Sequence, residues 1–228
     1  MSYRTIAMVY TGVGVGLLEN VEKEVRDLIP DFNCMVLGDK TMLQEAIDQQ
    51  TVTENVRRKM FNMYMTAVNN GADIIYNICS SVGDVAEAAK APLAYLGVPL
   101  VRIDEAMAAE AVKIGAKIGV MATLHSTMNP TKNLIQKKAG EIGKKIEITG
   151  IVVESAFSST GKSTSDQLLE AAISLADKVD VIVLAQGSMA PAESDLAKAT
   201  KKTVLSSPRF GAAALKEAFD EVMKIKNK

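Results

Sequence analysis

Short apolar runs rich in β-branched residues alternate with longer amphipathic stretches along the whole chain. The expected strands are 4–10, 33–37, 73–78, 99–103, 117–122, 146–153, 180–185 and 203–207. Helical spacing of apolar residues predicts helices over 51–69, 83–95, 104–114, 166–177 and 209–225. Several expected strands are continuously apolar, which is typical of strands that helices cover on both faces. The alternation therefore predicts an α/β protein with parallel sheets and right-handed crossovers.

Helix-start signals sharpen some of these boundaries. Asp104 is an expected N-cap of the helix that follows it, and Pro208 falls near the start of the last helix, where its missing N–H does no harm. A further helix is expected to begin near Pro130. In the Ser-rich stretch before 166 we expect a Ser or Thr to cap the next helix.

A degenerate internal repeat suggests two similar halves. "DIIYNICSS" (73–81) and "DVIVLAQGS" (180–188) each run from Asp through an apolar strand to a small polar turn, and "TIAMVYTG" is similar to "KIGVMATL". Six residues after the leading Asp stand Cys79 in one half and Gln186 in the other. Shared strand and turn composition is an alternative source of this likeness. Two such halves would present their strand ends to a ligand, as open α/β sheets usually do.

Composition narrows the classes of function. The 228 residues include 26 Lys and Arg and 27 Asp and Glu, so the net charge is −1. This charge provides no general electrostatic attraction to nucleic acid or to an anionic membrane. No apolar stretch approaches the roughly 20 residues that span a bilayer, and no basic and apolar N-terminal segment is present, so we expect a cytoplasmic protein. Two cysteines and one histidine are too few for a disulfide framework or a zinc site.

Two glycine-containing motifs invite a nucleotide-binding interpretation that their spacing does not support. "TGVGVG" (11–16) has the spacing G-x-G-x-G rather than that of a dinucleotide-binding turn, and no clean acidic residue ends the second strand. Either a turn whose N–H groups approach a carboxylate or a plain tight turn explains it. "TGKST" (160–164) lacks the earlier glycine of a P-loop, since Ala156 stands there.

Cys79 is the sharpest chemical signal. It ends an apolar strand, and Ser80, Ser81 and Gly83 follow it at the entrance to a helix. Helix N-terminal N–H groups favour a thiolate, and the hydroxyls suit a substrate carboxylate. The alternative is a small buried residue, which is how most free cysteines behave and how we interpret Cys34.

Two other strand ends are polar. In "MATLHSTMNPT" (121–131) Thr123, Ser126 and Thr127 supply hydroxyls, and His125 could titrate near neutral pH; an N-capping turn is the alternative. We expect His125 at the surface or behind the site. In "LAQGSM" (184–189) Gln186 and Ser188 can hydrogen-bond a ligand, although neither is an acid of ordinary strength.

With these motifs the chain resembles the aspartate/glutamate racemase superfamily, which includes hydantoin racemases, maleate isomerases and arylmalonate decarboxylase. The resemblance rests on "VYTGVGVG", "DIIYNICSSVGD", "IGVMATLHST", "DVIVLAQGSM" and "VLSSP". It implies two pseudosymmetric Rossmann-like domains, predicted as 1–101 plus 207–228 and 102–206, with parallel sheets flanked by helices and the active site in the interdomain cleft. It also implies catalysis without a cofactor, a small carboxylic acid or amino acid as substrate, and association into homodimers.

The resemblance assigns residues to roles. Cys79 matches the first of the family's two cysteines, and Thr123 and Thr127 fall where the family holds a substrate carboxylate. The substrate-binding residues expected on this basis are Thr11, Gly12, Ser80, Ser81, Thr123, Thr127, Gln186, Gly187 and Ser188.

Two departures from the family pattern leave the reaction open. Gln186 replaces the second cysteine, and Tyr10 and Thr11 stand where glutamate racemases carry a carboxylate. One outcome is an isomerase in which a water, His125 or Tyr10 completes the acid/base pair. Another is a one-base decarboxylation or tautomerisation, although arylmalonate decarboxylase has its thiol at the Gln186 position. The third is a non-catalytic carboxylate-binding protein on the same scaffold.

Overall fold

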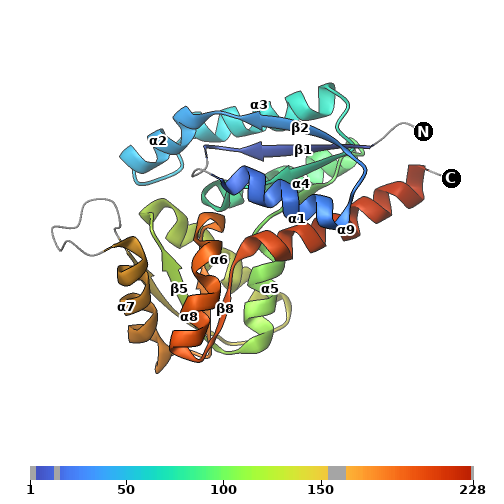
Figure 1. Cartoon of the computed structure of the whole chain (residues 1–228). Helices are drawn as coiled ribbons and strands as arrows, with labels where there is room; N and C mark the ends of the chain where they lie inside the picture. Colours follow the sequence, from blue (N-terminus) through green and yellow to red (C-terminus); the bar gives the residue numbers. More distant parts are fainter. Residues whose placement is uncertain (1–3, 13–15, 154–162, 227–228) are drawn as a thin grey trace. The chain divides into compact units, whose positions relative to one another are not determined.

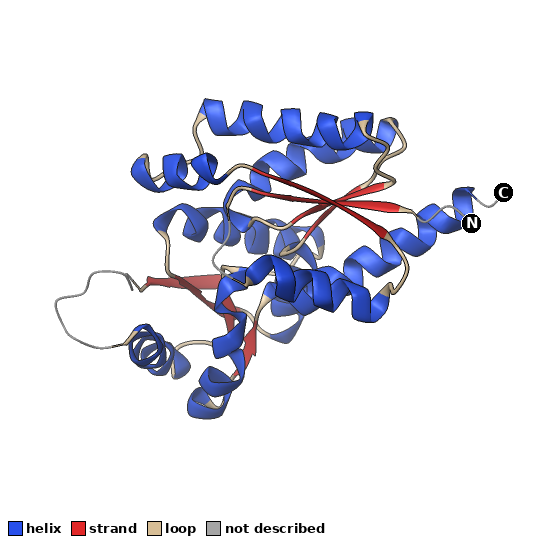
Figure 2. Cartoon of the chain, turned by 45° about the horizontal axis from the view of Figure 1, so that its top comes forward, coloured by secondary structure: helices blue, strands red, loops and turns tan. Residues whose placement is uncertain are grey.

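The computed structural model describes residues 4–12, 16–153 and 163–226. The chain divides into two compact units, one formed by Met1–Ile103 with Pro208–Lys228 and the other by Asp104–Ser207. Each unit is a parallel β-sheet between layers of helices, as the secondary-structure colouring in Figure 2 shows. The predicted α/β class with parallel sheets is therefore confirmed.

The first unit has a four-stranded sheet in the order β2-β1-β3-β4. Its strands are β1 (Thr5–Tyr10), β2 (Asn33–Gly38), β3 (Ile74–Asn77) and β4 (Leu100–Arg102). Its helices are α1 (Leu17–Leu28), α2 (Lys40–Asp48), α3 (Glu54–Asn69), the short 3₁₀ helix η1 (Ser80–Val82), α4 (Gly83–Tyr95) and α9 (Ser207–Lys226). Helices α1 and α9 pack on one face of this sheet, and α3 and α4 pack on the other (Figure 1).

The second unit repeats that topology, with strand order β6-β5-β7-β8. Its strands are β5 (Lys117–Ala122), β6 (Glu147–Val152), β7 (Val181–Leu184) and β8 (Thr203–Leu205). Its helices are α5 (Glu105–Ile114), α6 (His125–Glu141), α7 (Thr164–Ala176), the 3₁₀ helix η2 (Gly187–Ala192) and α8 (Glu193–Thr200). Helices α7 and α8 pack on one face of the sheet, where Leu168, Leu175 and Leu196 join its apolar core.

The leading Asp of each repeat has the same structural role in both units. Asp73 accepts the N–H of Thr5 at 2.8 Å, and Asp180 accepts the N–H of Lys117 at 2.8 Å. Both carboxylates thus fasten the start of the third strand of a unit to the start of its first strand. The N–H groups of Ala116 and Lys117 hold the pKa of Asp180 below its usual value, because they bond to its charged form.

Side-chain alternation along β1 decides what faces each helical layer. Ala7 and Val9 pack in the core with α3 and α4, whereas Ile6 and Met8 pack with α1 and α9. Because successive residues of a strand point to opposite faces, residues that share parity share a side of the sheet. This alternation determines which predicted site residues can meet.

One expected helix start differs in the structure, and one expected N-cap stands in place without its capping hydrogen bond. Helix α6 begins at His125, so Pro130 lies inside the helix and not near its start. The apolar positions Met128 and Ile135, seven residues apart, already continue the helical pattern across Pro130, and their burial offsets one lost backbone hydrogen bond. Asp104 occupies the N-cap position of α5, but its side chain makes no capping hydrogen bond.

The expected cap of the next helix is present. Ser163 precedes α7, and its hydroxyl accepts the N–H of Asp166 at 3.2 Å while it donates to the Asp166 carboxylate at 2.8 Å. This reciprocal pair satisfies one of the unpaired N–H groups at the helix start.

Candidate functional site

The site begins with a threonine–cysteine pair at the carboxyl ends of β1 and β3. Thr11 Oγ1 lies 2.8 Å from Cys79 Sγ, and either atom can be the donor. The pair follows from the strand register: Val9 is opposite Asn77, and the N–H of Ile78 bonds to the carbonyl of Val9 at 2.9 Å. Thr11 and Cys79 each stand two residues beyond that matched pair. The structure thus brings together two residues that the sequence selected separately.

A buried hydrogen-bonded chain holds the Cys79 backbone from behind. The Asn77 amide donates to the carbonyl of Cys79 at 3.0 Å, and the Tyr64 hydroxyl donates to the Asn77 amide oxygen at 2.9 Å. Burial strongly raises the pKa of the Tyr64 phenol, and a negative charge on Cys79 raises it further, so Tyr64 remains a donor at all ordinary pH values. Sequence reasoning missed both residues, although a polar Asn77 within an apolar strand was a usable signal.

The turn after Cys79 is polar and largely withdrawn from water. Thr11 is 2% exposed, Ser80 and Ser81 are each 5% exposed, and Cys79 is 8% exposed. Cys79 also contacts the apolar core that α3 and α4 build. Its thiol therefore has an apolar side and a side that carries hydroxyl groups. In such a poorly hydrated place, hydrogen bonds to a charged group are stronger than in water.

A buried cation lies close behind the same turn. Arg102, at the end of β4, is only 2% exposed, and its Nη1 lies 3.6 Å from a Glu87 carboxylate oxygen. The guanidinium packs so tightly on Gly83 that a Cβ there would come within 2.2 Å of Nη2. Arg102 also opposes the rise in the pKa of Tyr64. A fixed positive charge thus stands at the start of α4, in the neighbourhood of the thiol.

Gly12 closes the first strand end in a way that only glycine allows. Its φ is +114°, and a Cβ would lie 3.0 Å from the Cα of Lys40. The adjacent Thr11 carbonyl accepts the N–H of Leu43 at 3.1 Å, which ties the turn to α2. Gly12 therefore supports the placement of Thr11. Residues 13–15 of "TGVGVG" and 160–162 of "TGKST" lie outside the described residues.

The second unit carries a matching pair at the ends of β5 and β7. Gln186 Oε1 accepts the backbone N–H of Thr123 at 2.7 Å, and Gln186 Nε2 donates to Thr123 Oγ1 at 2.7 Å. The register is the same as in the first unit, because Met121 is opposite Leu184 and each member of the pair lies two residues further on. Where the first unit has a thiol, the second has an amide with both ends engaged.

A cavity of about 480 Å³ opens beside this second pair. Thr123 and Ser188 line it together with the first turn of α7 and the start of α8. Ser188 is exposed and Gly187, just before it, is buried. Two of the predicted substrate-binding residues of this unit therefore face a volume that can hold a small ligand.

The first turn of α6 contributes further hydroxyls. The side-chain oxygens of Ser126, Thr127 and Thr131 are buried and make no hydrogen bond within the described part of the chain. Polar groups that are buried without a partner cost free energy, so these three hydroxyls call for a partner that the described residues do not supply. His125 stands at the first position of the helix and is exposed, as expected for a surface residue.

Tyr10 and Cys34 are placed differently from what the sequence suggested. Tyr10 packs with the α1 and α9 core, on the opposite face of the sheet from Cys79, and its ring lies across Gly38. This placement argues against Tyr10 as the second acid or base. Cys34 is half-buried rather than sealed in the core; Glu22 and Arg26 lie near it, and burial raises the pKa of its thiol.

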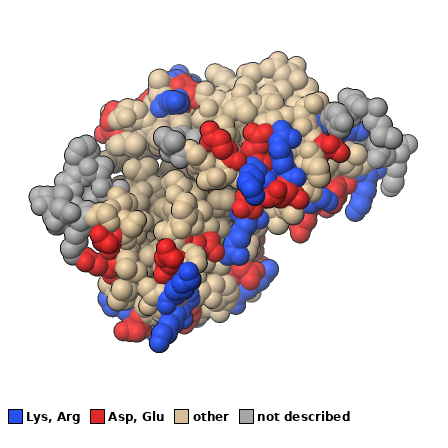
Figure 3. Space-filling view, viewed as in Figure 1, with Lys and Arg blue, Asp and Glu red and all other residues tan. Residues whose placement is uncertain are grey.

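Charged side chains of both signs are interspersed on the face shown in Figure 3. Among the described residues, many charged side chains pair along one helix, such as Lys23 with Asp27 at 2.9 Å and Arg26 with Glu22 at 2.7 Å on α1. Exposed pairs of this kind contribute little to stability. They belong to solvated helix faces and not to the candidate site.

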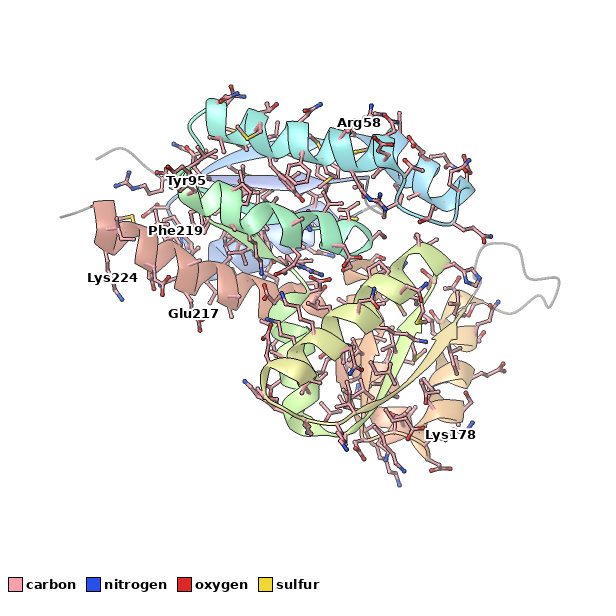
Figure 4. The ribbon with its side chains drawn as sticks, turned by 180° about the vertical axis from the view of Figure 1, so that it is seen from behind. Arg58, Tyr95, Lys178, Glu217, Phe219 and Lys224 are labelled. Atoms are coloured by element: carbon pink, nitrogen blue, oxygen red, sulfur yellow. The ribbon has the colours of Figure 1, made fainter. Side chains whose placement is uncertain are left out.

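A smaller cavity of about 260 Å³ lies between α4 and α9 in the first unit. Ala94, Pro99 and Val222 help to line it, at the amino end of β4 and thus at the opposite end of the sheet from Cys79. Figure 4 labels Tyr95 and Phe219 on these two helices. The residues that line this smaller cavity include no thiol and no hydroxyl group.

Among the described residues, no three His, Cys, Asp or Glu side chains cluster in a way that could hold a metal ion. Within those residues no helix combines the length and the apolar character that crossing a membrane requires.

The chain is similar in structure to glutamate racemase isoform RacE1 from Bacillus anthracis, with a TM-score of 0.75 and 20% identity over 97% of this chain and 83% of that one. It is similar to allantoin racemase from Klebsiella pneumoniae, with a TM-score of 0.64 and 15% identity over 96% and 88%. It also resembles arylmalonate decarboxylase, with a TM-score of 0.54 and 15% identity over 93% and 92%.

These similarities show a shared fold, since each identity is below 25%. No protein of curated function matches the chain. The sequence profile of the Asp/Glu/hydantoin racemase family, by contrast, matches residues 6–215, which span both units and every strand but the first residue of β1. The chain therefore belongs to the Asp/Glu/hydantoin racemase family.

Proposed function

We propose that this chain is a cofactor-independent enzyme that moves a proton at the carbon α to a carboxylate of a small acid or amino acid, with Cys79 as the acid/base. The observation that carries the proposal is the 2.8 Å contact between Thr11 Oγ1 and Cys79 Sγ. It places a hydroxyl on the sulfur at the carboxyl end of a parallel strand, in a turn that holds two more hydroxyls. Ligands of open α/β sheets usually bind at this end.

The first step is removal of the α-proton. The Cys79 thiolate takes it, so that a C–H bond breaks, an S–H bond forms and the electron pair enters the enolate of the substrate. Before the transfer a thiolate can only accept, so Thr11 is the donor of their hydrogen bond. The hydroxyls of Ser80 and Ser81 support the proposal as donors to the negative oxygen that develops on the enolate.

The second step returns a proton to the same carbon. Return of the proton by Cys79 restores the starting enantiomer, whereas protonation of the opposite face gives the other enantiomer. The Gln186 amide is no proton donor of ordinary strength, so a racemase of this sequence needs another donor, for which a water or His125 stays a candidate. That one ligand engages the strand ends of both units also stays a prediction.

A second candidate function is a one-base reaction, and the engagement of Gln186 by Thr123 favours it. A substrate with two carboxylates on one carbon would lose carbon dioxide, and the electron pair of the broken C–C bond would form an enediolate. The Cys79 S–H would then protonate that carbon from one face, and solvent would restore the thiol proton. A tautomerisation would use the same single group. A carboxylate-binding protein without turnover is the third alternative.

Proton exchange in heavy water tests these alternatives. Enantiopure amino acids, dicarboxylates and 2-substituted malonates are incubated with the protein, and NMR follows loss of the α-proton while chiral chromatography follows the two hands. The proposal predicts deuterium in recovered substrate for an isomerase, or release of carbon dioxide with one deuterium in the product for a decarboxylase.

Matched variants assign the activity. Cys79→Ser is expected to abolish turnover and Cys34→Ser to leave it unchanged, since Cys34 lies on another strand beside Glu22 and Arg26. If small acids raise the melting temperature of the wild type and of Cys79→Ser equally, with no exchange and no carbon dioxide, the chain is a binding protein and the enzymatic proposal is wrong.

A further inference from the structure

Gln186 has both ends of its amide bound to one residue. A backbone N–H can only donate, so the Gln186 atom that faces the N–H of Thr123 at 2.7 Å must be the carbonyl oxygen. The amide nitrogen therefore faces Thr123 Oγ1, also at 2.7 Å. The orientation of the Gln186 amide is thus fixed by the backbone of its neighbour, and the amide has no freedom to turn over.

This orientation determines what the Thr123 hydroxyl can do. The hydroxyl accepts a hydrogen bond from the amide nitrogen, and that nitrogen cannot accept the hydroxyl proton in return. The single proton of the hydroxyl is therefore left for another acceptor. A hydroxyl whose oxygen already accepts a hydrogen bond is also polarised into a stronger donor. The Thr123 N–H, in turn, is taken by Gln186 and is not available to a ligand.

The hydroxyl proton of Thr123 can be donated to a ligand in the neighbouring cavity. Thr123 lines the cavity of about 480 Å³, and the exposed Ser188 hydroxyl lines it as well. Leu168, Met189 and Leu196 form apolar parts of the wall. Asp166 and Asp195 line it too, the first bonded to the Ser163 hydroxyl and the second paired with Lys198. A ligand with an anionic oxygen at the Thr123 end would receive a charge-assisted hydrogen bond there.

We infer that Gln186 is a positioning residue, which acts through Thr123 and holds the Thr123 hydroxyl as an obligatory donor to a substrate carboxylate. The inference rests on the proposed function, in which the ligand is a small acid. Gln186 itself touches no reacting atom in this scheme. In this role Gln186 favours substrates that carry a hydrogen-bond acceptor at this position. It takes no part in proton transfer.

The first-unit pair shows why this role needs an amide. Thr11 and Cys79 occupy the same register, but either of them can donate to the other. A thiol thus leaves the direction of the hydrogen bond open, which suits a group that gains and loses a proton. The Gln186 amide removes that freedom in the second unit.

The test compares binding of malonate and succinate with binding of their neutral diamides, measured by calorimetry on the full chain. Thr123→Val is expected to weaken the acids about tenfold or more, because a hydrogen bond to a charged group is lost. Gln186→Met frees a rotor with about three staggered positions, so it should weaken the acids about threefold or more. The double variant should bind them no more weakly than Thr123→Val alone, and Thr123→Ser should remain near wild type.

The diamides separate positioning from simple damage. A variant that only disturbs the fold weakens acids and diamides alike, whereas loss of the oriented donor weakens the acids more than the diamides, because a hydrogen bond to a carboxylate is stronger than one to an amide oxygen. Equal loss for both probes, or a double variant that is additive, overturns the role of Gln186 while wild-type acid binding still supports the proposed ligand. No binding of any acid to the wild type overturns both. Acid binding without turnover, together with the acid-specific losses in the variants, overturns the reaction and supports the role of Gln186.

Discussion

Replacing Thr11 by Val isolates the contact on which the catalytic proposal depends. Val keeps the shape of Thr and removes the hydroxyl that lies 2.8 Å from Cys79 Sγ. Thr11 is 2% exposed, so water has little room to replace the lost group. A hydrogen bond to a charged group contributes about 1.5–3 kcal/mol, which corresponds to a factor of about 10 to 150 in the rate of a reaction that needs the charged form.

Alkylation of a cysteine by iodoacetamide is such a reaction, because the thiolate is the nucleophile. Peptide mass spectrometry at timed intervals gives the rate at Cys79 and, in the same molecule, at Cys34. We expect Thr11→Val to slow Cys79 about 10- to 150-fold and to leave Cys34 unchanged. Thr11→Ser, which keeps the hydroxyl, should react nearly as the wild type does.

The direction of the hydrogen bond decides the outcome. If Thr11 accepts from a neutral thiol, its removal deprives the thiol form of a partner, and Cys79 in Thr11→Val reacts as fast as or faster than in the wild type. That result would refute the view that Thr11 stabilises a thiolate, and with it the role of Cys79 as a base at neutral pH. Unchanged melting temperatures for both variants exclude a folding defect as the cause of a slower rate.

Three further substitutions test the scaffold of the site. Tyr64→Phe leaves a buried amide oxygen on β3 without its donor, so we expect a loss of about 1–3 kcal/mol in urea unfolding. Asp180→Asn keeps an acceptor and removes the charge; because the folded-state pKa of Asp180 is lowered, its stabilisation is present above the usual value of 3.8 and disappears as the pH falls through the lower folded-state value. The urea midpoints of wild type and Asp180→Asn should therefore differ at pH 7 and converge below pH 3.8. Gly83→Ala forces the buried Arg102 guanidinium aside and should cost about 1–3 kcal/mol, whereas Gly140→Ala, with open space around its Cβ, should be neutral or stabilising.

The strands were predictable because their burial on two faces leaves continuous apolar runs. The expected strand over 117–122 has the same bounds as β5, because its apolar run from 118 to 122 is the part that is buried in the sheet. The start of α6 was not predictable in the same way. Pro130 is a strong local signal for a helix start, but burial of residues on both sides of it carries the helix back to His125. Tertiary packing, and not the local preference of proline for the first turn, determines where α6 begins.

The site was predictable as a set of positions and not as a set of contacts. Cys79 and Thr11 stood out as polar residues at strand ends, but that one contacts the other depends on which strands are neighbours and in what register. Tyr64 lies in the middle of a helix, and nothing in its local sequence points to a hydrogen bond with Asn77. The amide of Gln186 could be recognised as a departure, whereas its binding to the Thr123 backbone required coordinates.

The two units share their strand register, their leading Asp and their strand-end Thr, so Cys79 and Gln186 are a chemical difference at an equivalent position. Gln186→Cys tests that conclusion, because the register that places Cys79 beside Thr11 should place the new thiol beside Thr123. If one ligand engages the strand ends of both units, as proposed above, and wild-type turnover uses one base, the variant should gain a second proton donor, and its products should lose stereochemical purity in chiral chromatography. Gln186→Ser, which is similarly small but no comparable acid, should not cause that loss. Products of unchanged purity from Gln186→Cys would contradict the proposal that one ligand engages both strand ends.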